Sequence, residues 1–151
     1  MASRGFEFVG MIDGSNATPV IKDFILGAAA AHKVGDLMLM QSDGYIDQVT
    51  TTTTEVTCVM MEAVAAASIT AGTTTAKAAI LTRNQIWRCS SDGTSLSAVI
   101  GYTKAIDTVD ANTVDADSTT GGAMLLYDSG TDDDGNALAY VVFADTTFGN
   151  V

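Results

Sequence analysis

The fold is decided by a stretch that opens with Gly35-Asp36-Leu37-Met38-Leu39-Met40, turns at Ser42-Asp43-Gly44 and continues as Tyr45-Ile46-Asp47-Gln48-Val49. Asp-Gly between two apolar runs is typical of a β-hairpin, because these residues accept the positive φ angles that tight turns need. Three more short apolar runs follow at residues 56–64, 76–82 and 85–89, each bounded by turn-forming or threonine-rich residues. Several short strands that close on one another predict a small β-barrel or sandwich.

The rest of the 151-residue chain predicts two additions to this core. Residues 1–20 form an N-terminal arm, residues 21–102 form the β-barrel core, and residues 103–151 form a C-terminal β unit packed on the core. Within that unit, an acidic loop joins apolar runs at residues 123–127 and 138–143 into a hairpin. The predicted fold is therefore all-β: a small β-barrel or sandwich core with an extended N-terminal arm and a C-terminal β-hairpin unit.

The arm carries the first candidate contact residues, Phe6, Phe8, Val9 and Ile12. They are apolar enough to favour burial, and the turn formers at residues 13–19 separate them from the core. We expect this strand to add to a neighbouring subunit or to a larger shell, so that deletion of residues 2–12 leaves a folded domain. The alternative is that the strand folds back onto the chain's own sheet.

Trp87 and Arg88 are the second candidate contact site. Tryptophan and arginine are enriched among the residues that anchor protein interfaces, so the pair is interpreted as a subunit or capsid contact. A ligand platform is another interpretation of Trp87. A core tryptophan inside the barrel is an equally good one.

The net charge of −11 is unevenly distributed. Residues 1–90 hold eight acids and six bases, a net charge of −2, whereas residues 91–151 hold ten acids and only Lys104, a net charge of −9. Such an acidic surface repels phosphate backbones, so we expect no nucleic-acid partner. No apolar run approaches the roughly 20 residues of a membrane span, and the N-terminus lacks the apolar segment of a signal peptide, so no membrane partner is expected.

The candidate chemical groups do not form a catalytic or metal-binding pattern. His32 is the one histidine, and the chain lacks the Gly-x-Ser-x-Gly elbow that positions a serine nucleophile. Cys58 and Cys89 lie in separate apolar runs, which indicates buried, reduced thiols rather than a metal cluster. We therefore predict no catalytic residue, no cofactor and no metal, and interpret the chain as a non-enzyme.

The loop Asp132-Asp133-Asp134-Gly135-Asn136 needs a separate test, because it resembles part of a calcium loop. An EF-hand has an aspartate at loop position one and a glutamate at position twelve. With Asp134-Gly135 at positions five and six, Gly130 and Val141 occupy those two places. A solvated hairpin tip is the better interpretation, and a looser surface calcium site stays open.

The pattern of strands and turns resembles the capsid decoration, or cement, proteins of tailed bacteriophages. The resemblance rests on features of the first hairpin, Gly35-Asp36 and the turn at Asp43-Gly44, and on the loop before residues 76–82 with the return at residues 86–89. It also rests on Thr119-Thr120-Gly121-Gly122 before the last hairpin and on the closing Val141-Val142-Phe143. It implies a structural virion protein on the capsid exterior that binds the major capsid protein, assembles as a homotrimer and stabilises the head. Members of this family have no catalytic residues, so the resemblance carries over no site.

Two other classes stay open. A carbohydrate- or receptor-binding module of a phage tail or surface structure would use exposed aromatic residues such as Trp87, Tyr102 or Tyr127. A small enzyme would need a deep pocket with perturbed carboxylates.

Overall fold

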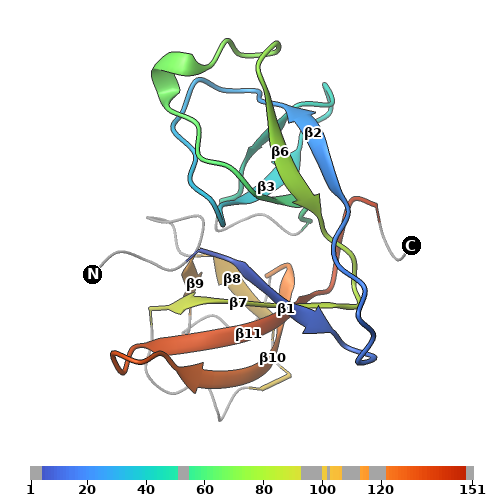
Figure 1. Cartoon of the computed structure of the whole chain (residues 1–151), viewed down its shortest axis with the longest axis vertical. Helices are drawn as coiled ribbons and strands as arrows, with labels where there is room; N and C mark the ends of the chain where they lie inside the picture. The colour runs from blue at the N-terminus through green and yellow to red at the C-terminus, as the bar shows by residue number, and fades with distance from the viewer. Residues whose placement is uncertain are drawn as a thin grey trace.

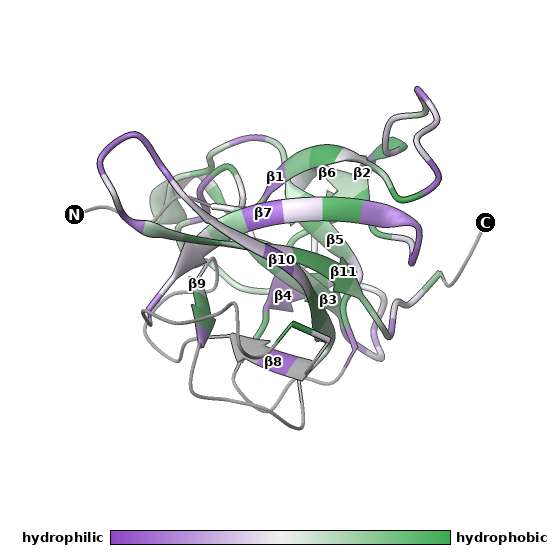
Figure 2. Cartoon of the chain, turned by 90° about the horizontal axis from the view of Figure 1, so that it is seen from below, coloured by the Kyte–Doolittle hydropathy of each residue, from purple (hydrophilic) through white to green (hydrophobic). Residues whose placement is uncertain are grey.

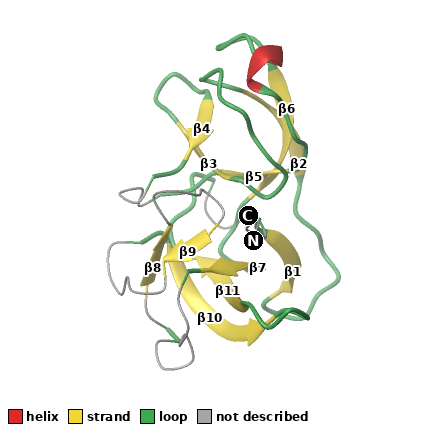
Figure 3. Cartoon of the chain, turned by 90° about the vertical axis from the view of Figure 1, so that its left-hand side faces the viewer, coloured by secondary structure: helices red, strands yellow, loops and turns green. Residues whose placement is uncertain are grey.

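The computed structural model describes residues 5–50, 55–92, 100–101, 103–106, 113–115 and 122–148, which form two stacked, mainly antiparallel β-sheets (Figure 1). The upper sheet has the strand order β2-β6-β5-β3-β4. Its strands are β2 (Ile21–Ile25), β3 (Leu37–Met40), β4 (Ile46–Gln48), β5 (Cys58–Met60) and β6 (Thr75–Ile80). One short helical turn is present in the described part of the chain, η1 (Ala66–Ser68), drawn red in Figure 3. The predicted all-β class is confirmed.

The lower sheet combines the first strand with all the strands of the second half of the chain, in the order β1-β7-β11-β10-β8-β9. Its strands are β1 (Glu7–Met11), β7 (Gln85–Ser91), β8 (Thr103–Ile106), β9 (Thr113–Asp115), β10 (Met124–Thr131) and β11 (Ala137–Phe143). β9, the last strand in this order, also pairs in parallel with β7, the second strand.

Local turn chemistry accounts for both predicted hairpins, and both are confirmed. β3 pairs with β4 across Asp43-Gly44, where Gly44 has a φ of +86° and the Tyr45 N–H donates to Asp43 Oδ1 at 2.9 Å. β10 pairs with β11 across the acidic loop. In that loop Asp132 Oδ1 accepts hydrogen bonds from the backbone N–H groups of Asp134 and Asn136, so the loop folds on its own side chains.

The central strand β5 of the upper sheet and the start of β3 are buried on both faces, because alternate residues of these strands point into different cores. The upper core lies within the upper sheet and contains Phe24, Leu26, Met38, Ile46, Cys58, Met60, Ile69, Ala76 and Ala78. The shared core lies between the two sheets and contains Leu37, Val59, Ala79 and Leu81 from the upper side with Phe6, Trp87, Cys89, Val141 and Phe143, among others, from the lower side. Figure 2 shows the resulting hydrophobic colouring along β5 and β11. A strand buried on both faces has a continuous apolar sequence, as Cys58-Val59-Met60 does.

Of the two predicted forms of the core over residues 21–102, a barrel or a sandwich, the structure is compatible with the sandwich, and its described residues do not form a closed barrel. The chain leaves the upper sheet after β6, turns at residues 81–84 and enters the lower sheet with β7, so the apolar runs of this stretch are shared between two sheets. The physical reason is that Leu81 and Trp87, on either side of the corner, both pack into the shared core. After β6 the chain therefore passes from the upper sheet to the lower sheet at residues 81–84.

The prediction that residues 1–20 extend away from the domain is also wrong for the described residues. β1 pairs antiparallel with β7, with Glu7 opposite Arg88 and Phe8 opposite Trp87. Phe6 is only 3% exposed and belongs to the shared core, and its N–H donates to the Gly35 carbonyl at 2.9 Å. Burial of the Phe6 ring in the chain's own core is the favourable alternative to an extended arm.

Candidate functional site

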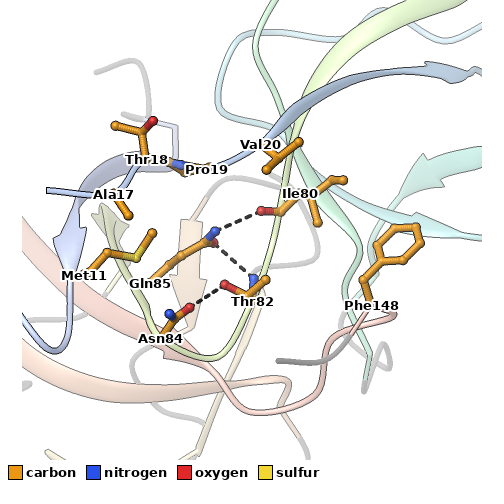
Figure 4. A pocket seen from close by; sticks show the side chains of 10 residues that line it. All are labelled: Met11, Ala17, Thr18, Pro19, Val20, Ile80, Thr82, Asn84, Gln85 and Phe148. Carbon is orange, nitrogen blue, oxygen red and sulfur yellow. Dashed lines mark hydrogen bonds between the residues drawn. The ribbon is translucent and has the colours of Figure 1, made fainter. Parts of the chain in front are cut away.

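A pocket of about 460 Å³ lies where the chain passes twice between the two sheets (Figure 4). Three segments form its wall: the end of β1 with the linker to β2, the corner between β6 and β7, and the end of the described chain. The lining residues are Met11, Ala17, Thr18, Pro19, Val20, Ile80, Thr82, Asn84, Gln85 and Phe148. All ten are uncharged, so the pocket suits an apolar group.

Gln85 holds the corner between β6 and β7 in place. Its side-chain oxygen accepts hydrogen bonds from the Thr82 backbone N–H at 3.2 Å and from Trp87 Nε1–H at 3.0 Å, and its amide nitrogen donates to the Ile80 carbonyl at 3.0 Å. The hydroxyl of Thr82 donates to Asn84 Oδ1 at 2.6 Å (Figure 4). Because Gln85 is only 2% exposed, these bonds fix one wall of the pocket rigidly.

Phe148 reaches the pocket because the chain after β11 crosses to the upper sheet. The Val56 N–H donates to the Asp145 carbonyl at 3.1 Å, and the Thr147 N–H donates to the Val56 carbonyl at 2.9 Å. The ring of Phe148 then lies 6.5 Å from that of Phe24, centroid to centroid. Phe148 stays 40% exposed, although its ring contacts the upper core.

Large apolar side chains are exposed on β1, on β2 and on the segments that form the pocket wall. Val20 lines the pocket and is 66% exposed, and Ile21, the next residue, is 53% exposed. Val9 and Ile12, near Met11 in the sequence, are 46% and 48% exposed. We call Val9, Ile12, Val20, Ile21 and Phe148 the apolar rim. Clustered exposed apolar side chains are typical of surfaces that bind a partner.

Ion pairs balance most of the charge near this rim. Glu7 pairs with Arg88 between β1 and β7, Asp23 with Lys77 between β2 and β6, and Arg83 with Asp145 near the corner. Lys22 differs, because its ammonium group lies 5.1 Å from the centre of the Phe24 ring and contacts no carboxylate in the described part of the chain. The rim is thus close to neutral in a protein of net charge −11.

The six predicted contact residues have different environments. Phe6 and Trp87 are buried, and Phe8 packs edge-on against Trp87 with the ring centres 5.6 Å apart. Val9 and Ile12 are exposed, as a contact surface requires. Arg88 pairs with Glu7, with Nε 2.9 Å from Glu7 Oε2. Trp87, at 1% exposure, is therefore the core tryptophan and not a ligand platform.

The sequence matches no protein-family model and no curated protein. In the described part of the chain, no helix is long and apolar enough to span a bilayer. Among the same residues, no three His, Cys, Asp or Glu side chains are grouped as metal ligands. Of the other aromatic residues considered for carbohydrate binding, Tyr127 is 45% exposed and Tyr102 lies outside the described residues.

The potential nucleophiles and bases are buried away from the pocket. Burial raises the pKa of the Cys58 thiol to about 12 and also raises that of Cys89, which keeps both as unreactive thiols. His32 is 4% exposed, and burial lowers its pKa despite the nearby carboxylates of Asp36 and Asp47. Cys58, Cys89 and His32 are not among the residues that line the apolar pocket.

Sequence reasoning missed the pocket, and in particular Gln85 and Phe148. Gln85 occupies a turn position in the sequence, and nothing local to it indicates that three buried groups depend on its amide. Phe148 lies 128 residues from Val20, across the pocket from it. The available signal was the apolar pair Val20-Ile21 directly after the turn-rich linker, which is unusual for the start of an edge strand.

Proposed function

We propose that this protein is a structural component of a tailed-bacteriophage head, which binds the major capsid protein on the outer surface of the shell as a homotrimer and stabilises it. The observation that supports this proposal best is the apolar rim. It lies where β1 and β2, edge strands of the two sheets, are joined. A binding surface without catalytic groups fits a cement protein better than an enzyme.

The free edge of β1 allows a partner to bind by strand addition. β1 has a strand neighbour, β7, on one side, and its other side carries no strand in the described part of the chain. A register shift between Phe8 and Gly10 places Val9 in a bulge, outside the paired ladder. An extended segment of a capsid subunit could add to this edge through main-chain hydrogen bonds and cover Val9 and Ile12. Of the contact residues expected in the arm, this proposal keeps Val9 and Ile12, with β1 as a docking edge instead of a free arm.

The charge distribution supports the same orientation. The acidic loop between β10 and β11 lies at one side of the molecule, and the linker between β1 and β2 lies at the other (Figure 1). A near-neutral rim can approach a capsid surface without the repulsion that the acidic loop would cause. The acidic side then faces solvent, where it repels nucleic acid and other virions.

The experiment uses heads assembled from the major capsid protein of the same genome without this chain. Purified protein is added, and occupancy is measured by sedimentation and cryo-electron microscopy. The double variant Val9→Lys/Ile12→Lys should bind at least about tenfold more weakly, because charged edge residues oppose strand addition. Tyr127→Lys on β10 is the matched control and should bind like wild type.

Density for three copies around the three-fold positions would support the trimer as well as the capsid contact. Absence of wild-type protein from the heads would refute the proposal. Equal loss of binding in the Tyr127→Lys control would place the contact on β10 instead of on β1.

A further inference from the structure

We infer that the pocket and Lys22 together bind an extended segment of the capsid protein, which places an apolar side chain in the pocket and an acidic side chain on the ammonium group. This inference rests on the proposed function, since it names the part of the partner that binds. It goes beyond the edge of β1 that the capsid contact uses, because most of the pocket wall comes from the linker before β2 and from the corner between β6 and β7.

The pocket has the size and chemistry to hold an apolar side chain. A volume of about 460 Å³ lies within the roughly 300–1,000 Å³ of typical ligand pockets. Its wall combines apolar side chains such as Met11 and Ile80 with the hydrogen-bonded amide of Gln85, which is already occupied by three partners. The wall thus offers an apolar surface that is held in place before a ligand arrives, which lowers the entropic cost of binding.

The backbone beside the pocket has groups that can pair with a ligand. The linker residues Asn16, Ala17 and Thr18 are exposed, and within the described residues their backbone N–H groups donate no hydrogen bond. Thr18 precedes Pro19 and so favours an extended conformation. An extended ligand can pair with this segment and direct alternate side chains toward the pocket, as peptides do when they add to a sheet edge.

One charged group near the pocket is the ammonium group of Lys22. Lys22 lies two residues after Val20 and hence on the same side of an extended chain. Its ammonium group is held over the Phe24 ring, next to Phe148 at the pocket wall. Other cations on this side, Lys77 and Arg83, already have carboxylate partners. The ammonium group of Lys22, which contacts no carboxylate among the described residues, selects a carboxylate, and this favours an acidic-apolar segment over a basic one.

A second copy of the chain is a weaker candidate for the occupant. The exposed acidic loop Asp132-Asp133-Asp134 of a second copy carries carboxylates but has no large apolar side chain to insert. A separate capsid segment avoids this difficulty.

Two substitutions block the two halves of the site. Ala17→Phe places a large ring at an exposed position of the pocket wall, where it fills the pocket without burying new surface in the core. Lys22→Glu reverses the charge. The matched controls are Ala71→Phe in an exposed turn and Lys33→Glu in an exposed loop. Thermal unfolding of all four variants first checks that each remains folded.

Binding to the assembled heads is then measured for wild type and the four variants. We expect A17F and K22E to bind about tenfold more weakly and the controls within about twofold of wild type. If wild type binds the heads and A17F binds equally well, the inference is overturned while the proposed function stands. Self-association that depends on concentration and is lost in A17F would assign the pocket to a second copy and also overturn it.

A random linear peptide library, selected on immobilised wild type and on A17F, separates this inference from the proposed function. Peptides retained by wild type alone should pair an apolar residue with Asp or Glu about two positions away. If wild type fails to bind heads, the capsid assignment falls, and this selection alone decides whether the pocket takes such a segment. Selection of the same peptides by both proteins would refute the pocket.

Discussion

At the scale of single residues, the amide of Gln85 determines whether the corner between the sheets is stable. The substitution Gln85→Ala removes this amide, and Trp87 Nε1–H, the Thr82 N–H and the Ile80 carbonyl then lose their hydrogen-bond partner. Each buried polar group left unpaired costs about 1–3 kcal/mol, so we expect a loss of about 3 kcal/mol or more in the free energy of unfolding. Urea denaturation measures it, with Gln41→Ala at an exposed site as the control, expected within about 0.5 kcal/mol of wild type.

His32 is expected to make stability depend on pH. Both ring nitrogens are buried and have no hydrogen-bond partner among the residues that the structure describes, and burial lowers the folded-state pKa below its ordinary value of 6.5. Between that lowered pKa and 6.5 the unfolded state binds more protons than the folded state. The contribution of His32 to the free energy of unfolding therefore falls as the pH drops below 6.5. It stops falling once the pH is below the folded-state pKa.

The variant His32→Leu tests this pH dependence, because His32 is the one histidine in the chain. Urea midpoints between pH 5 and pH 8 should decline with acidification in wild type and change much less in the variant. Parallel curves for the two proteins would show that His32 is not the group that titrates.

At the scale of elements, β1 is a structural strand of the lower sheet. Phe6 lies 5.8 Å from the Phe143 ring, centroid to centroid, and the backbone of Gly5 packs directly against that of Gly35. Phe6→Ala should cost about 3–5 kcal/mol, whereas Val9→Ala, at an exposed position, should cost little. Deletion of residues 2–12 should give aggregated protein on size-exclusion chromatography. A soluble deletion variant with a native β-sheet circular dichroism spectrum would contradict this account.

The same elements show what could be predicted from sequence. The hairpins at Asp43-Gly44 and at the acidic loop were predictable, because residues next to each other in the chain determine those turns. The pairing of β1 with β7 was not, because Glu7 and Arg88 are 81 residues apart and an apolar strand such as Phe6-Glu7-Phe8-Val9 pairs equally well with a neighbour or with its own chain. The pocket depends on three distant segments and was unpredictable for the same reason.

At the scale of the whole molecule, the shared core should make the two sheets unfold together. Leu37, Val59 and Leu81 of the upper side are completely buried, and they pack against side chains of the lower sheet. If the upper sheet opened alone, these side chains would become exposed to solvent. Full exposure of each large apolar side chain costs roughly 1.5–3 kcal/mol. The pairs Val56–Thr146 and Phe6–Gly35 add backbone hydrogen bonds between the two sheets at separate points.

The two cysteines test this cooperativity directly, because Cys58 lies in the upper core and Cys89 in the shared core. Both are free and buried, so a thiol reagent reaches either of them only when its surroundings open. Cys58→Ala leaves Cys89 as the one reactive thiol, and Cys89→Ala leaves Cys58. After correction for each variant's free energy of unfolding, the two labelling rates should agree within about threefold and should follow global unfolding as urea is added. Labelling of Cys58 about a hundredfold faster than Cys89, with little dependence on urea, would show that the upper sheet opens by itself. In that case the shared core would not couple the sheets, and the pocket between them would be expected to change shape when the upper sheet opens.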